Sequence, residues 1–120
     1  MKIFGHEYGF ALTVGASAQI SKLCPEGDLS RLGEVLSGSV FAETAEAGAA
    51  IVVAMANAYD QMQKFSGNEV EHPPLTTEML FALPQNEYMA VLNSAMSAFG
   101  ADTAVTVEVE PSKKKENNVG

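Results

Sequence analysis

The chain has 120 residues and a formal net charge of −8, with 47 % hydrophobic and 18 % charged residues. This length and composition predict one globular domain with its own core, and they argue against an intrinsically disordered chain. Residues 1–111 carry fourteen acidic and four basic side chains, so the domain repels phosphate backbones and nucleic-acid binding is not expected. The single cysteine, Cys24, rules out an intramolecular disulfide framework and fits a reducing compartment. No apolar run reaches 18 residues, so no membrane span is expected.

The first third of the chain predicts a hairpin and two short helices. The β-forming segments Ile3-Phe4 and Tyr8-Gly9-Phe10 flank the turn-like trio Gly5-His6-Glu7, a pattern typical of a short β-hairpin. Thr13 is expected to cap a helix of about ten residues, and Asp28 to cap a second short helix.

The longest predicted helix runs from Phe41 to Phe65. Apolar residues recur there at alternating spacings of four and three, which places them on one helical face. These residues are Phe41, Ala45, Gly48, Val52, Met55, Tyr59 and Met62. Polar residues, Asp60 among them, are expected on the opposite face toward water.

The last third predicts a loop, two helices and a strand. A loop over residues 66–75 is followed by a helix that begins at Thr76, and Pro84 suits the first turn of another helix that ends at Gly100. Apolar and polar residues alternate over 104–110, which predicts a half-buried strand. Its edge could pair with a second copy or close against the N-terminal hairpin, so self-association stays open.

These elements predict a mainly α fold: a compact helical domain of four to five helices around a long central helix, with a short N-terminal β-hairpin and a C-terminal strand. We expect this single α-rich domain to span residues 1–110. The Lys-containing segment 111–120 has no apolar periodicity and is expected to be a flexible tail.

The sequence offers no arrangement that catalysis requires. His6 and His72 are the two histidines, both in predicted turns where exposure is expected, and with one cysteine they do not suggest a zinc site. No glycine-rich phosphate loop and no paired nucleophile and base are recognisable. We therefore expect no catalytic, metal-binding or cofactor-binding residues and no enzymatic activity.

Three segments carry a family resemblance. The opening Lys-Ile-Phe-Gly-His-Glu-Tyr-Gly-Phe resembles the K-I-x-G-K-E-Y-x-F hairpin start of tail assembly chaperones from long-tailed bacteriophages and prophages. Leu-Thr-Thr-Glu-Met-Leu at 75–80 resembles their L-T-x-E-E-L helix start. The Val/Glu segment followed by Lys113-Lys114-Lys115 is similar to these proteins near their programmed frameshift site. The chain would then be the short, non-frameshifted product.

The resemblance implies a non-enzymatic tail assembly chaperone. Its implied partners are the tape measure protein, the major tail protein and its own frameshifted longer form. It would act in the bacterial host cytoplasm during virion assembly and be absent from the mature virion. The alternatives are a structural phage component, such as a head–tail connector or tail subunit, and a small helical adaptor protein.

A partner-binding surface is expected from large apolar residues near the ends of elements. These candidates are Phe4, Tyr8, Tyr59, Met62 and Met89. The same residues could instead belong to the core.

Overall fold

The computed structural model describes residues 1–103 and confirms a mainly α fold around one long helix. The predicted strand at 104–110, the tail at 111–120 and the lysines Lys113–Lys115 lie outside the described residues. In chain order the elements are β1 (Lys2–Ile3), β2 (His6–Glu7), α1 (Val14–Ser21), α2 (Leu32–Leu36), α3 (Phe41–Phe65), α4 (Thr77–Phe81) and α5 (Gln85–Thr103). Two 3-10 turns, Pro25–Gly27 and Leu29–Arg31, precede α2.

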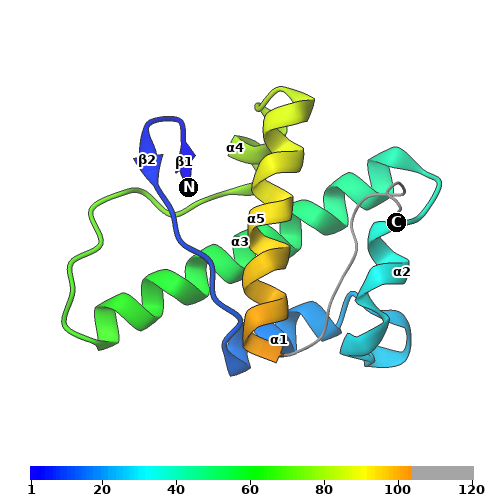
Figure 1. Ribbon diagram of the computed structural model, residues 1–120, viewed down its shortest axis with the longest axis horizontal. Helices are drawn as coiled ribbons and strands as arrows, with labels where there is room; N and C mark the ends of the chain where they lie inside the picture. Colours follow the sequence, from blue (N-terminus) through cyan, green and yellow to red (C-terminus); the bar gives the residue numbers. More distant parts are fainter. Residues whose placement is uncertain (104–120) are drawn as a thin grey trace, which may run out of the picture.

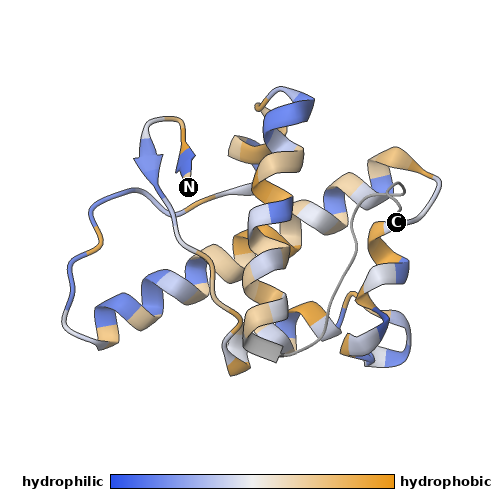
Figure 2. Ribbon diagram, in the orientation of Figure 1, coloured by the Kyte–Doolittle hydropathy of each residue, from blue (hydrophilic) through white to orange (hydrophobic). Residues whose placement is uncertain are grey.

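The central helix α3 has the predicted bounds, Phe41–Phe65, and contacts α1, α2, α4 and α5 (Figure 1). The middle of its apolar face is fully buried, with Ile51, Val52 and Met55 each 0 % exposed. In Figure 2 the apolar residues gather where α5 crosses α3, and polar residues become frequent toward the end that leads to the loop. The core is therefore built on the middle of α3, and both ends of the helix project beyond it.

The N-terminal hairpin is present, but its turn lies one residue earlier than predicted. β1 and β2 are antiparallel, with Ile3 opposite His6, so Phe4 and Gly5 form the connection. Both residues have positive φ, 50° and 83°, the backbone geometry of the tight two-residue turns that match the twist of a hairpin. The prediction that His6 and Glu7 belong to the turn and Tyr8–Phe10 to the strand is wrong.

The predicted caps at Thr13 and Thr76 are confirmed, whereas Asp28 caps a 3-10 turn and not an α-helix. Thr13 accepts a hydrogen bond from the Ala16 amide at 3.1 Å, and Thr76 accepts one from the Met79 amide at 3.2 Å. Asp28 caps the 3-10 turn before α2 by accepting from the Ser30 amide at 3.0 Å. Each cap satisfies a backbone donor that the first turn of a helix leaves unpaired.

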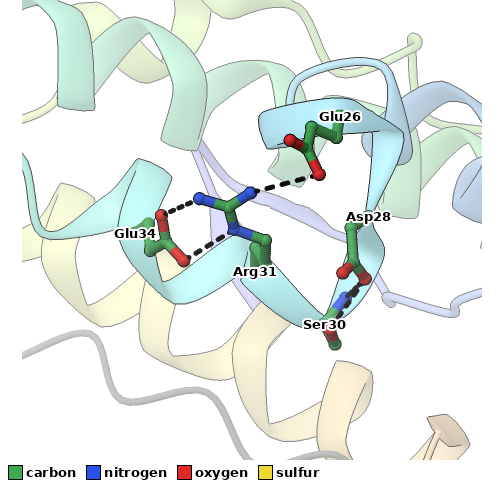
Figure 3. A network of polar contacts seen from close by, with 5 residues as sticks. All are labelled: Glu26, Asp28, Ser30, Arg31 and Glu34. Atoms are coloured by element: carbon green, nitrogen blue, oxygen red, sulfur yellow. Dashed lines mark hydrogen bonds and ion pairs between the residues drawn. The ribbon is translucent and has the colours of Figure 1, made fainter.

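A polar network fixes the segment before α2 (Figure 3). The Arg31 guanidinium donates two hydrogen bonds of 2.9 Å to the Glu34 carboxylate, and its third nitrogen lies 3.7 Å from Glu26. The bonds from Arg31 lower the pKa of Glu34, and those from Ser30 lower the pKa of Asp28. These groups are exposed, so the network orders the loop more than it stabilises the fold.

The last helix is longer than predicted. α5 runs through Gly100 to Thr103, so the expectation that Gly100 ends it is wrong. Phe99 is 0 % exposed, and its burial holds the final turns against the core although glycine is a poor helix former. Among the described residues, no helix is both long and apolar enough to cross a membrane.

Gly9 permits a close approach between the N-terminal segment and α3. A Cβ atom at this position would lie 2.6 Å from the Tyr59 ring. We therefore expect Gly9→Ala to lower the free energy of unfolding by about 1–2 kcal/mol, because the ring must leave its packed position. Urea unfolding followed by circular dichroism would measure the change. In a Tyr59→Ala background the same substitution should cost less than about 0.5 kcal/mol, and an equal cost there would contradict the explanation.

Candidate functional site

An apolar groove lies where the start of α3, the short helix α4 and the start of α5 meet. It has a volume of about 200 Å³. Phe41 and Phe81 stand at its edge, 62 % and 52 % exposed, while Leu80 and Tyr88 are buried beneath them. The residues that line the groove are Phe41, Ala45, Leu80, Phe81, Leu83, Gln85 and Tyr88. Exposed aromatic rings beside a concave apolar floor are typical of a surface that binds a partner.

The groove is formed by the tight connection between α4 and α5. The Thr76 cap begins α4 at Thr77. Pro84 keeps α4 short, because proline disfavours a helical conformation in the residue before it. The Tyr88 amide donates to the Pro84 carbonyl at 2.9 Å, which starts α5 immediately after the turn. As a result, Leu80 and Tyr88 line the same groove beside the start of α3.

Tyr88 fixes the floor of the groove against α3. Its hydroxyl donates to the Ala45 carbonyl at 2.8 Å, and burial raises the pKa of Tyr88, so this donor remains protonated at neutral pH. A Cβ atom on Gly48 would lie 2.5 Å from that hydroxyl oxygen, so glycine is needed for this approach. The floor therefore has a defined geometry, and no hydrogen-bonding capacity of the Tyr88 hydroxyl proton is left for a partner.

A second, more polar hollow of about 450 Å³ lies between α1, α3 and Pro74. Asp60 and Lys64 are the charged residues on its wall. Asp60 is 7 % exposed, and its carboxylate oxygens lie 3.0 and 2.9 Å from Nε2 of His72. The ring of Tyr8 lies 4.2 Å from the His72 ring, and its hydroxyl donates to the Pro73 carbonyl at 2.7 Å.

This buried cluster corrects two expectations. Asp60 does not face water with the other polar residues of α3, and His72 is not an exposed loop histidine. The pairing is possible because the loop from Ser66 to Leu75 folds back along α3, which brings two residues twelve positions apart into contact. The cluster attaches both the loop and the hairpin to α3.

The five residues predicted to bind a partner do not form one surface. Phe4 and Met62 are exposed, at 55 % and 47 %. Tyr8 is 1 % exposed and belongs to the core, the alternative that the sequence left open for all five residues. Tyr59 is half-buried beside Gly9, and Met89 is half-buried against the core. Partner binding by these residues stays a prediction.

Sequence reasoning missed the groove because its residues resemble core residues. Phe41 begins the apolar stripe of α3, which is expected to face inward, and Phe81 follows Leu80 in a helix too short for its faces to be told apart. The two phenylalanines differ from core residues in their position at the ends of helices. Phe41 is the first residue of α3 and Phe81 the last of α4, where a helix extends past the residues that could cover it.

The described residues contain no gathering of three or more His, Cys, Asp or Glu side chains that could hold a metal ion. Cys24 is buried, and burial raises the pKa of its thiol, which disfavours the nucleophilic thiolate. Comparison with known proteins gave no match: no family model matches the chain, and no curated protein or solved structure does.

Proposed function

We propose that this protein is a non-enzymatic phage tail assembly chaperone that binds the tape measure protein and helps to recruit the major tail protein. The observation that carries the proposal is the apolar groove between α3, α4 and α5, with Phe41 and Phe81 exposed at its edge. Two half-exposed aromatic rings beside an apolar hollow form a continuous apolar surface, which favours binding of a partner. The resemblance of the hairpin start, the 75–80 segment and the lysine-containing end supplies the biological role.

The size and chemistry of the groove favour a protein partner. Small-molecule sites have volumes of roughly 300–1,000 Å³ and combine an apolar lining with several converging polar groups. Here the groove holds about 200 Å³ and its lining is mostly aliphatic and aromatic. It has room for an anchoring side chain of a partner rather than for a whole cofactor.

Weak binding at each groove suits a chaperone that later releases its client. A small interface supplies modest affinity, and repeated copies along an elongated client hold the assembly together through avidity. The acidic surface keeps the unbound chaperone in solution. In this proposal the protein acts in the host cytoplasm, together with its own frameshifted longer form, and leaves before the virion is complete.

The test is co-expression with a tape measure protein, whose gene this proposal expects beside the gene of this chain. The chaperone should increase the soluble fraction of the tape measure protein and copurify with it. The double variant Phe41→Ser/Phe81→Ser should lose most of that effect, while Phe65→Ser, which changes a ring 89 % exposed at the other end of α3, should retain it. Equal performance of both variants would contradict a role for the groove.

Purified virions decide between this role and a structural one. We expect the protein to be absent from them, and a stoichiometric band would assign it to the particle instead. The nucleotides encoding Lys113–Lys115 give an independent check. A slippery A-rich sequence that opens onto a second reading frame supports the proposal, and lysine codons without an overlapping frame remove the support of the resemblance.

A further inference from the structure

From the lining and the charge of the groove we infer that its occupant is an amphipathic α-helix whose apolar side chains are flanked by lysine or arginine. This inference deepens the proposed function and rests on its binding role, since it names the chemistry of the client segment. It uses the backbone around the groove and the glutamates on its helices.

The walls of the groove favour a helical backbone in the occupant. The groove is walled by three helices, whose backbone amides and carbonyls are bonded within their own helices except at the first and last turns, and the Ala45 carbonyl also accepts from Tyr88. These walls offer no row of free donors and acceptors such as a sheet edge presents to an added strand. An extended peptide would leave its own backbone unpaired over apolar side chains, which is costly. A helix satisfies its backbone internally and can present side chains alone.

Acidic side chains surround the groove. Four exposed glutamates each lie within three residues of a lining residue: Glu43 and Glu46 on α3, Glu78 on α4 and Glu87 on α5. Among the described residues of these three helices the one basic side chain is Lys64, in the last turn of α3. At about 1.5 Å per residue it lies more than 30 Å from Phe41, beyond the range of unscreened attraction at physiological salt. The charged side chains that these three helices place near the groove are therefore all acidic.

A basic amphipathic helix fits both the apolar floor and the acidic surroundings. An apolar stripe on a helix would place an anchoring residue between Phe41 and Phe81, above Leu80 and Tyr88. Lysine or arginine side chains beside that stripe would reach the surrounding glutamates through their long aliphatic stems. Such ion pairs at the edge of the groove raise the association rate and select a positively charged partner, while the buried anchoring residue supplies the affinity.

The chain's own tail is a less suitable occupant. Lys113–Lys115 supply basic charge, but the valines at 105, 107 and 109 alternate with threonine and glutamate, a pattern of period two rather than the helical period. α5 begins at the groove and is 19 residues long. The last of these valines is six residues beyond Thr103, a span of at most about 22 Å, which is less than the roughly 28 Å length of α5, so the valines cannot reach the groove.

The experiment uses the full chain and a fluorescein-labelled synthetic helix of leucine and lysine, with leucines at helical spacing. Fluorescence polarisation at low salt should show saturable binding. Phe81→Ser should weaken it by about tenfold, the effect of losing one anchoring contact. Phe65→Ser should leave it unchanged. No saturable binding, or equal losses in both variants, would overturn the inference.

Charge variants test the role of these acidic side chains. Glu78→Lys/Glu87→Lys should weaken binding several-fold and flatten its salt dependence, whereas Glu69→Lys/Glu71→Lys, which makes the same change of net charge on the exposed loop after α3, should have a smaller effect. Equal effects of the two double variants would mean that only the net charge of the protein attracts the peptide, and they would overturn the inference.

Peptide variants test the occupant. A peptide with glutamate in place of lysine should not bind, and a peptide of the same composition with central prolines should bind at least tenfold more weakly because it cannot form the helix. Equal binding of either peptide would overturn the inference. Tighter binding to Lys113→Gln/Lys114→Gln/Lys115→Gln would overturn it in favour of the chain's own tail.

The synthetic helix also separates this inference from the proposed function. If the helix binds in the groove but the tape measure protein is neither solubilised nor copurified, the role in tail assembly fails and the groove chemistry stands. If the tape measure protein copurifies through Phe41 and Phe81 but the helix does not bind, the chaperone role stands and the inferred chemistry fails.

Discussion

Replacing Phe99 with alanine should lower the free energy of unfolding by about 3–4 kcal/mol, a large loss for a single substitution in a domain of this size. The Phe99 side chain is 0 % exposed in the penultimate turn of α5. Its removal deletes a full aromatic ring from the core and leaves a cavity that the surrounding helices close only in part. Because Gly100 follows it, the end of α5 has little intrinsic helix propensity to compensate.

Phe65 provides the matched control, since it is the same residue type near the end of the other long helix. Its side chain is 89 % exposed, so Phe65→Ala should change stability by less than about 0.5 kcal/mol. Urea unfolding monitored by the helical circular dichroism signal would give both values under one set of conditions. Similar losses in the two variants would contradict the burial of Phe99, and with it the extension of α5 beyond Gly100.

Asp60→Ala is expected to cost about 2–3 kcal/mol. The carboxylate lies in a largely buried position, with side-chain exposures of 10 % for Asp60 and 15 % for His72. Its removal leaves the His72 ring without its partner in a site that water reaches poorly, and a buried polar group without a hydrogen bond is costly. The loss should spread to the contact between His72 and Tyr8, which attaches the hairpin.

Two further variants distinguish pairing from packing. Asp60→Asn keeps an oxygen that can accept from His72, so it should recover about half of the lost stability. Gln61→Ala, at the exposed neighbouring position, should change stability by less than about 0.5 kcal/mol. Hydrogen exchange should show faster opening of the loop over 66–76 in Asp60→Ala and not in Gln61→Ala. Unchanged exchange in both variants would mean that the pair does not hold the loop.

Local signals in the sequence were sufficient for most of the fold. The bounds of α3 follow from the spacing of its apolar residues, and the starts of α1 and α4 follow from Thr13 and Thr76. These features depend on residues within one or two helical turns of each other. The hairpin turn was misplaced by one residue because Phe4 adopts positive φ, a conformation that is uncommon for a bulky residue.

The features that sequence reasoning missed depend on residues far apart in the chain. Periodicity places Asp60 on the polar side of α3, and only the folded path of the loop covers it with His72. The groove likewise needs Phe41 and Tyr88 to meet, and no local pattern relates positions so far apart. The exposure of Phe4 and Met62 and the burial of Tyr8 were equally undetermined, because apolar size does not indicate which residues the core will cover.

The attachment of the hairpin has a consequence for synthesis on the ribosome. Tyr8 is held by His72 and Pro73, residues made 64 and 65 positions later. At about 5–20 residues per second, the first strands must wait several seconds after they emerge before their binding site exists. A two-stranded hairpin is only marginally stable alone, so during this interval the N-terminal segment is not docked on the rest of the fold. The order of translation therefore makes docking of the N-terminus a late event, whereas α1, α2 and α3 can begin to associate before it.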